Sequence, residues 1–320
     1  MAAKSNRNDL TVSWIHIPSS TCPPNPRPLK GAQVFILGSN LNMQAAEADS
    51  DEINDDRRGV LNAVLDADAL IFATPVYSHS PAGALKGFLD KILGSFTDAS
   101  FARRTLERQQ AGDPMFAAHK IDARLLKPRV VGFIAVAGST TPDRVSLALP
   151  VLHLLVYCLH AKVVDQEDLM GYGYPGIVVA KDNGAAIARA QQIGRNVASQ
   201  IGKPFDEAQY LGPEPFGACP YCHLAKFELL SKDNKIGCVT CGALGKLEVD
   251  KNGGVMPVWE TDSQICSITL AGKYRHLDDL INNGRVEMKA IASDAEFEKK
   301  RDHWRSIEVP VVPLSSMASR

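Results

Sequence analysis

Short apolar runs alternate with amphipathic helical segments between Val34 and Gly202. This alternation is typical of consecutive β–α–β units, which place parallel strands between layers of helices. Each apolar run is nearly unbroken, as expected for a strand that is covered on both faces. The sequence therefore predicts an α/β fold with a doubly wound parallel sheet. The predicted strands are residues 33–37, 69–74, 130–137 and 176–180.

Helical periodicity fills the intervals between these strands. Apolar residues recur every three or four positions in four segments, residues 55–65, 82–93, 141–160 and 182–202. Thr141 followed by Pro142 suits an N-cap and a first helical residue. Residues 94–127 interrupt the pattern and are long for a connection in an α/β unit, where about 2–6 residues are usual. We interpret them as an inserted excursion that serves the site or a dimer contact.

The most informative segment is residues 67–91, whose sequence is ADALIFATPVYSHSPAGALKGFLDK. A strand that ends in Thr-Pro-Val-Tyr and leads directly into a helix places hydroxyls, backbone amides and one aromatic ring at the carboxyl edge of a parallel sheet. Doubly wound folds bind their ligands at that edge. The segment therefore predicts a ligand site.

Residues 67–91 resemble the flavodoxin-like NAD(P)H-dependent FMN reductases and quinone reductases, including the flavin domain of iron–sulfur flavoproteins. The resemblance is close over about 25 residues and extends more weakly over about residues 30–204. It implies a flavodoxin-like fold, bound FMN and hydride transfer from a nicotinamide. It also implies that the Pro-Val-Tyr loop wraps the flavin ring and that a Gly-rich loop lies opposite, with Tyr77 and His79 as catalytic candidates. The implied flavin contacts are Thr74, Pro75, Val76, Tyr77, Ser78 and His79 on one side and Ala137, Gly138 and Ser139 on the other.

The region that would hold the FMN phosphate departs from the family pattern. Relatives bind the phosphate in a Ser/Thr-rich loop between the first strand and a long helix, where free amides and the helix dipole favour an anion. Here the candidate hydroxyls Ser19, Ser20 and Thr21 are followed by a proline-rich segment that cannot continue as a helix. Residues 38–40 are the alternative loop. The cluster cysteines of iron–sulfur flavoproteins are absent from the segment before residue 55, so no cluster is predicted there.

Two Cys-x-x-Cys pairs, Cys219/Cys222 and Cys238/Cys241, are separated by fifteen residues. Four thiolates in this spacing can close a tetrahedron, the geometry of structural zinc. Predicted strands at residues 224–230, 244–249 and 255–259 complete a zinc ribbon, after a Pro- and Gly-rich linker. Rubredoxin-type iron is the alternative, although its loop between the pairs is usually longer. A closed site of four thiolates has no open position, so we assign it folding energy and no catalysis.

Composition limits the other classes of function. The 320 residues carry a formal net charge of −1, so there is no global field to attract nucleic acid or an anionic membrane. No signal-peptide pattern is visible near the N-terminus. The most apolar stretch, residues 147–164, is interrupted by Pro150, His153, His160 and Lys162, so it does not suit a membrane span of about 20 residues. We expect a cytoplasmic protein that binds no nucleic acid and no membrane and forms a homo-oligomer, a dimer or a tetramer.

The sequence thus predicts three parts. They are a flavodoxin-like domain over residues 1–205 with the excursion at 94–127, a linker and zinc ribbon over 206–268, and a helical tail over 269–320. The leading hypothesis is an FMN-dependent NAD(P)H oxidoreductase that passes hydride through the flavin to a small organic acceptor, quinone-like or other. One alternative is a flavin reductase that supplies a partner monooxygenase. Another is a non-enzymatic scaffold that acts through its ribbon.

Overall fold

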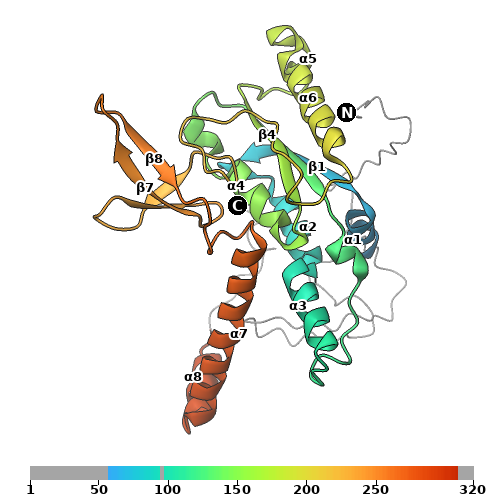
Figure 1. Cartoon of the computed structure of the whole chain (residues 1–320), viewed down its shortest axis with the longest axis vertical. Helices are drawn as coiled ribbons and strands as arrows, with labels where there is room; N and C mark the ends of the chain where they lie inside the picture. Colours follow the sequence, from blue (N-terminus) through green and yellow to red (C-terminus); the bar gives the residue numbers. More distant parts are fainter. Residues whose placement is uncertain (1–56, 94–96, 309–320) are drawn as a thin grey trace. The chain divides into compact units, whose positions relative to one another are not determined.

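The computed structural model describes residues 57–93 and 97–308 (Figure 1). The described residues up to Leu277 belong to one compact unit, and those from Asp278 onward belong to a second. The predicted strand at 33–37 and both candidate phosphate loops lie outside the described residues.

Three parallel strands form the centre of the first unit. They are β1 (Ala69–Tyr77), β3 (Val130–Ala137) and β4 (Lys162–Met170), and the short antiparallel β2 (Ser80–Pro81) extends the sheet in the order β2-β1-β3-β4. The register pairs Pro75 with Val136 and Ala137 with Met170. The carboxyl ends of all three strands therefore meet at one edge of the sheet.

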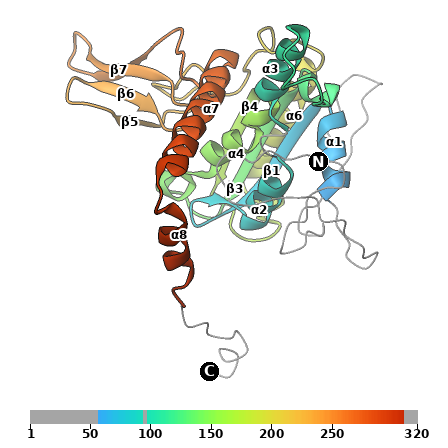
Figure 2. The ribbon, with the colours of Figure 1, turned by 90° about the horizontal axis from the view of Figure 1, so that it is seen from below.

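Helices cover both faces of this sheet. Successive side chains of a strand point to opposite faces of the sheet. The side-chain partners of neighbouring β4 residues therefore show which helix covers each face. Glu167 binds Arg189 of α6 (Ala185–Gln200), whereas Gln166 binds His153 of α4 (Ala148–Val156). Figure 2 shows the sheet between α6 and α4.

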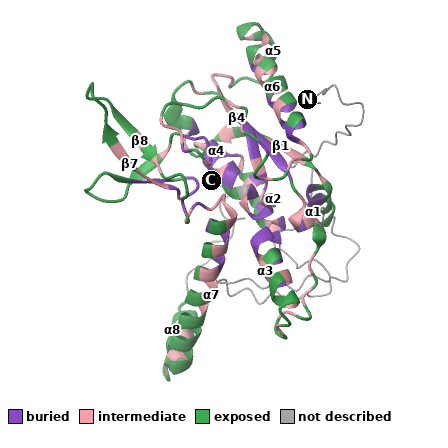
Figure 3. Ribbon diagram, viewed as in Figure 1, coloured by how far each residue is buried: buried purple, intermediate pink, exposed green. Residues whose placement is uncertain are grey.

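Two further helices complete the layer on the α4 side. The helix α2 (Gly83–Ile92) packs against α4, and α1 (Arg57–Asp66) packs against α2. Buried residues gather on the sheet and on the inward sides of these helices (Figure 3). The arrangement confirms the predicted doubly wound α/β fold.

The prediction for the last strand was wrong. Residues 176–180 are not a strand but contain the short helix α5 (Ile177–Ala180), which starts after Gly176 in a left-handed conformation with φ of 82°. The strand that was not predicted, β4, contains several charged residues and has no long apolar run. Its buried Asp165 is neutralised by Arg189, with Nη1 donating at 2.9 Å. A buried charge is tolerated when it is paired and hydrogen-bonded in this way.

The predicted helix over 141–160 is divided into three pieces. They are a 3₁₀ turn η4 (Pro142–Val145), α4, and a second turn η5 (Tyr157–Leu159). Pro150 lacks an N–H and so belongs in the first turn of a helix, where no partner is needed, and α4 begins two residues before it. The segment Pro142–Leu159 is apolar enough to pass for a membrane span but is 53% buried in the protein. Core packing accounts for its apolar character.

The excursion contains α3 (Ala99–Gln110) and the turn η3 (Ala123–Leu126). Asp98 caps α3, because its carboxylate accepts hydrogen bonds from the backbone amides of Ser100 and Phe101. Ala102 and Thr105 on α3 are fully buried. The excursion therefore contributes to the packed core of the domain.

A second, antiparallel sheet follows in the order β5 (Phe227–Leu229), β6 (Lys235–Cys238), β7 (Leu244–Val249), β8 (Val255–Trp259). The last two strands coincide with the predicted residues. The first is shorter than predicted, and β6 lies between the first two predicted strands, where no strand was predicted. We call residues 217–268 the cysteine module. The chain continues into α7 (Leu270–Ser293) and α8 (Phe297–Arg305), which confirms helices in the tail.

A glycine in β3 sets the distance between the sheet and α6. A Cβ atom at Gly132 would lie 2.8 Å from Cγ2 of Val197 and 3.0 Å from Cγ2 of Ile193. Gly132→Ala is therefore expected to lower the free energy of unfolding by about 1–3 kcal/mol, as overpacked cores do. Urea unfolding followed by circular dichroism measures the change.

Gly59→Ala in α1 is the matched control, because nothing lies within 4 Å of its Cβ position. It should leave stability unchanged or raise it by up to about 1 kcal/mol through helix propensity. Equal stabilities of the two variants would contradict the tight contact between β3 and α6.

Candidate functional site

The strand β1 continues past Thr74 and turns back at Tyr77 in a tight hairpin. Val76 pairs with Pro81 and Tyr77 pairs with Ser80, so Ser78 and His79 are the two central residues of the turn. Both have positive φ, 48° and 71°, which is the conformation of a type I′ turn. Non-glycine residues adopt it rarely and at a cost of about 1–3 kcal/mol, and they cluster at functional sites. The strained turn marks this hairpin as a site candidate.

Hydrogen bonds to the segment after β3 hold the hairpin. The Nδ1–H of His79 donates to the carbonyl oxygen of Asp143 at 2.6 Å, and the amide of Leu147 donates to the carbonyl of His79 at 3.1 Å. In the tautomer with its hydrogen on Nδ1, the imidazole presents Nε2 as an acceptor. His79 therefore fixes the hairpin with one ring nitrogen and leaves the other for a ligand.

The predicted flavin-contact residues on this hairpin differ in how far they are exposed to a ligand. Thr74 is buried, and its hydroxyl donates to the carbonyl of Pro75 at 2.9 Å and accepts from the amide of Ala82 at 3.1 Å, so it pins the hairpin to the start of α2. Tyr77 is 65% exposed, and Pro75 and Ser78 are also exposed. An exposed aromatic ring beside exposed backbone is a surface on which a planar ligand can lie.

The second predicted loop, Ala137-Gly138-Ser139, lies at the end of the neighbouring strand. The amide of Tyr172 donates to the carbonyl of Ala137 at 2.9 Å, and the amide of Gly171 donates to that of Ser139 at 2.8 Å. A Cβ atom at Gly138 would lie 3.0 Å from the Cα of Gly173. The backbones at Gly138 and Gly173 lie so close together that only a residue without a Cβ atom fits.

The structure thus brings the hairpin Pro75–His79 and the loop Ala137–Ser139 to adjacent strand ends. It adds the loop at residues 171–176, with the sequence GYGYPG, which sequence reasoning did not assign to the site. Its signal was the run of glycines and tyrosines, which becomes meaningful only once β4 is recognised before it. The phosphate candidates Ser19, Ser20 and Thr21 lie outside the described residues, so their assignment stays a prediction.

Two ionisable side chains near this edge were also missed. Asp168 lies on β4 opposite Ala135, and its Oδ1 is enclosed with no hydrogen-bond partner among the described residues. Burial raises the pKa of this carboxyl to about 7, against the opposing effect of the Lys226 ammonium. Burial likewise lowers the pKa of Lys226, whose Nζ donates to the carbonyl of Ser146 at 2.9 Å. These residues are far apart in the sequence, and no local pattern joins them.

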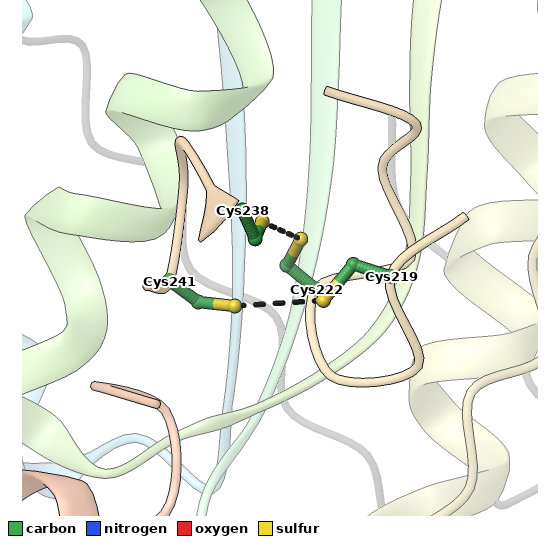
Figure 4. A group of neighbouring side chains, drawn as sticks. All are labelled: Cys219, Cys222, Cys238 and Cys241. Carbon is green, nitrogen blue, oxygen red and sulfur yellow. Dashed lines mark hydrogen bonds between the residues drawn. The ribbon is translucent and has the colours of Figure 1, made fainter. Parts of the chain in front are cut away.

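The four predicted metal ligands are gathered in one buried group. Their sulfur atoms all lie within 4.8 Å of one another (Figure 4). The Sγ atoms of Cys219 and Cys241 are 3.6 Å apart and those of Cys222 and Cys238 are 3.5 Å apart. A tetrahedron with Zn–S bonds of about 2.3 Å has S···S edges of about 3.8 Å, whereas a disulfide needs about 2.05 Å. The spacing fits four ligands around one ion.

Both Cys-x-x-Cys turns have the same backbone. The amide after the second cysteine donates to the carbonyl of the first, from His223 to Cys219 at 2.8 Å and from Gly242 to Cys238 at 2.9 Å. His223 and Gly242 both have positive φ, 60° and 75°. His223 is held in this conformation by stacking on Tyr210 at 3.7 Å between ring centroids. It therefore supports the turn, as expected for a residue that is not a ligand.

A buried hydrogen-bond chain joins the cysteine module to the main sheet. The side-chain amide of Gln166 on β4 donates to the carbonyl of Cys222 at 2.8 Å, and the Nε2–H of His153 on α4 donates to Oε1 of Gln166 at 2.8 Å. Burial lowers the pKa of His153 to about 4, so the ring is neutral at pH 7. The four cysteines belong to the same hydrophobic cluster as the α/β domain.

The comparisons with known proteins agree with the class that this fold and edge define, a flavodoxin-like α/β protein. The sequence model of the family described as NADPH-dependent FMN reductase matches residues 28–170. Flavone synthase cfoJ of Aspergillus candidus is 33% identical over 257 residues, which are 79% of this chain and 76% of that protein. A solved flavone reductase superposes with a TM-score of 0.65 and 26% identity, covering 81% of this chain and 83% of that chain.

The chain belongs to the NADPH-dependent FMN reductase family and is an NAD(P)H-dependent flavin oxidoreductase. The likeness to flavone synthase cfoJ extends beyond the family match. An alignment of 257 residues cannot be contained in residues 1–205, so it includes part of the chain that carries the cysteine module.

The raised pKa of Asp168 makes a prediction about stability. Between pH 4 and pH 7 the folded chain holds a proton on Asp168 that the unfolded chain has released, so this group's stabilising contribution decreases as the pH rises. Asp168→Asn removes that dependence. Urea unfolding of both proteins from pH 5 to pH 8 should show the wild type losing stability relative to the variant up to about pH 7, with no further change above it. A constant difference across this range would contradict the raised pKa.

Proposed function

We propose that this protein uses NAD(P)H and FMN to reduce a flavone-type acceptor, adding hydrogen across the double bond that is conjugated with the ring carbonyl. One observation carries the proposal. The two relatives that match most of the chain are named for the formation and the reduction of flavones, and the match to the first extends into the cysteine module. A flavone is flat and conjugated, and it would suit a site that already binds a flat flavin.

The described residues fit the flavin. Bound FMN supplies two-electron chemistry, taking hydride from a nicotinamide and passing it on. The hairpin offers the exposed ring of Tyr77 and the rigid backbone around Pro75, and the facing loop offers the exposed backbone of Gly138. The pairing of Pro75 with Val136 puts these two surfaces on adjacent strands. We therefore place the flat ring of the flavin at this edge, against both surfaces.

The chain's own residues orient and anchor this site. The strained turn at Ser78–His79 is preset by the bonds of His79 to the segment after β3, so a ligand meets a rigid wall. Preset groups lose less entropy on binding than mobile ones. The Ser139 and Thr141 hydroxyls, 3.1 Å apart, give the opposite loop donors and acceptors for the polar edge of a flavin.

The proposal predicts that the isolated protein, given FMN and then NADPH under anaerobic conditions, loses the yellow absorbance of its flavin. Addition of a flavone should restore the absorbance with one equivalent of flavone consumed per flavin, and chromatography should show the dihydro product. Stopped-flow absorbance follows both half-reactions.

Two controls separate this function from its alternatives. A quinone tested alone identifies a quinone-type acceptor, and dioxygen tested alone identifies a reductase that only releases reduced flavin. Restoration of the absorbance by either of these but not by a flavone would contradict the proposal. Family membership already favours an enzyme over a scaffold. The oligomeric state and the cytoplasmic location remain predictions from the sequence.

For the cysteine module we propose a structural Zn²⁺ held by four thiolates. It is supported by the close spacing and burial of the four sulfur atoms and by the matched turns that carry them. A closed thiolate tetrahedron stabilises a small module, because binding free energy becomes folding free energy. It gives the ion no open coordination position and no role in turnover.

The protein purified without added metal should contain one zinc per chain, and removal by a strong chelator should lower the melting temperature. Cys219→Ser should lose the zinc, whereas Cys158→Ser, which changes a buried thiol outside the group, should retain it. Mass spectrometry of metals and thermal unfolding measure these outcomes. Iron in place of zinc, or no metal with a Cys219–Cys241 disulfide, would contradict the assignment.

A further inference from the structure

Asp168 differs from the other acids of β4. Its neighbours Asp165 and Glu167 face α6 and bind Arg189. Asp168 points to the opposite face with Gln166, where its Oδ1 is enclosed and unpartnered among the described residues. A buried polar atom without a partner costs about 1–3 kcal/mol, and it needs an explanation.

Charged groups on two elements influence the ionisation of Asp168. Lys226 belongs to the cysteine module, just before β5, and Glu167 is the neighbouring residue on β4, whose side chain binds Arg189. The Lys226 ammonium favours the ionised carboxylate, whereas Glu167 and burial favour the neutral acid. Burial has the largest effect, so the acid retains its proton up to about pH 7.

Lys226 is connected to the hairpin through one short segment. Lys226 donates to the carbonyl of Ser146, and the next residue, Leu147, donates its amide to the carbonyl of His79. Asp168 lies near the same edge of the sheet, because it pairs with Ala135, which also pairs with Thr74 at the base of the hairpin. A buried carboxyl and an ammonium thus lie near the candidate flavin surface. Neither is used by the binding roles described above.

We propose that Asp168 is the proton donor for reduction of the flavone-type acceptor and that Lys226 positions and tunes it. The inference rests on the proposed function. When hydride reaches C2 of the acceptor, the C2=C3 π electrons move to C3, and the O–H bond of Asp168 breaks as a C3–H bond forms. The acceptor gains two electrons and two hydrogens, the nicotinamide is oxidised by two electrons, and the carboxylate regains its proton from water.

A general acid of this kind works best when its pKa is near the operating pH, and it contributes about 10²–10⁴-fold to the rate. Burial raises the pKa of Asp168 to about 7, which is near the operating pH. A carboxyl exposed to water would have a pKa of about 3.9 and would be ionised at pH 7.

The test compares Asp168→Asn with the wild type in separate half-reactions. FMN binding and flavin reduction by NADPH should be unchanged, whereas reoxidation of the reduced flavin by a flavone should slow by about 10²-fold or more. The wild-type rate of that step should fall as the pH rises through about 7, and the residual rate of the variant should not. Asp90→Asn, which changes an exposed acid on α2 that pairs with Lys86, is the matched control and should keep the rate of this step within about threefold.

A readout that needs no acceptor accompanies these rates. Infrared spectra of protein labelled with ¹³C-aspartate should show a carboxylic-acid band that disappears near pH 7 and is missing in Asp168→Asn. Lys226→Ala should move this transition to higher pH, because the ammonium that favours the carboxylate is gone. A lysine with a purely structural role would leave the transition in place.

Each failure has its own signature. Flavone-driven reoxidation in Asp168→Asn at the wild-type rate overturns the proton-donor role alone. If NADPH reduces the flavin of the wild type but a flavone does not reoxidise it, both the proposed function and this role are overturned. An acid band that titrates near pH 4 contradicts the environment assigned to Asp168.

Discussion

The buried side-chain amide of Gln166 is the interaction on which the two sheets of the first unit depend. It donates to the carbonyl of Cys222 and accepts from His153, so one side chain links β4, α4 and the first cysteine turn. All three groups are buried. Loss of this amide would leave a buried donor and a buried acceptor unsatisfied, at about 1–3 kcal/mol each. The cysteine module is therefore joined to the α/β domain by more than a linker.

This link connects the proposed metal centre to the proposed flavin site. An ion that fixes the turn at Cys222 also fixes the chain that follows it, including Lys226. Lys226 then binds the segment that holds the hairpin through Leu147 and His79. The cysteine module is thereby connected to one edge of the proposed site, as supporting residues around a binding surface are.

Much of the candidate site could be predicted because its signals are local. The hairpin residues follow an apolar strand directly, and the paired cysteines have the spacing that metal ligation requires. The strand β4 was missed because its Asp165 and Glu167 are neutralised by Arg189, a residue of the next helix. Gly176, with a left-handed backbone, precedes the last apolar run, which forms the short helix α5 where a strand was predicted. Asp168 and Lys226 meet only through tertiary folding, so no sequence window contains their relation.

The central claim is that the hairpin Pro75–His79 and the loop Ala137–Ser139 form the two walls of a flavin site. A crystal structure of the protein with FMN tests it most directly. The account predicts that the flavin ring lies between Tyr77 and Gly138, with the Ser78–His79 turn unchanged. A flavin bound elsewhere, or bound only after that turn unfolds, would contradict it.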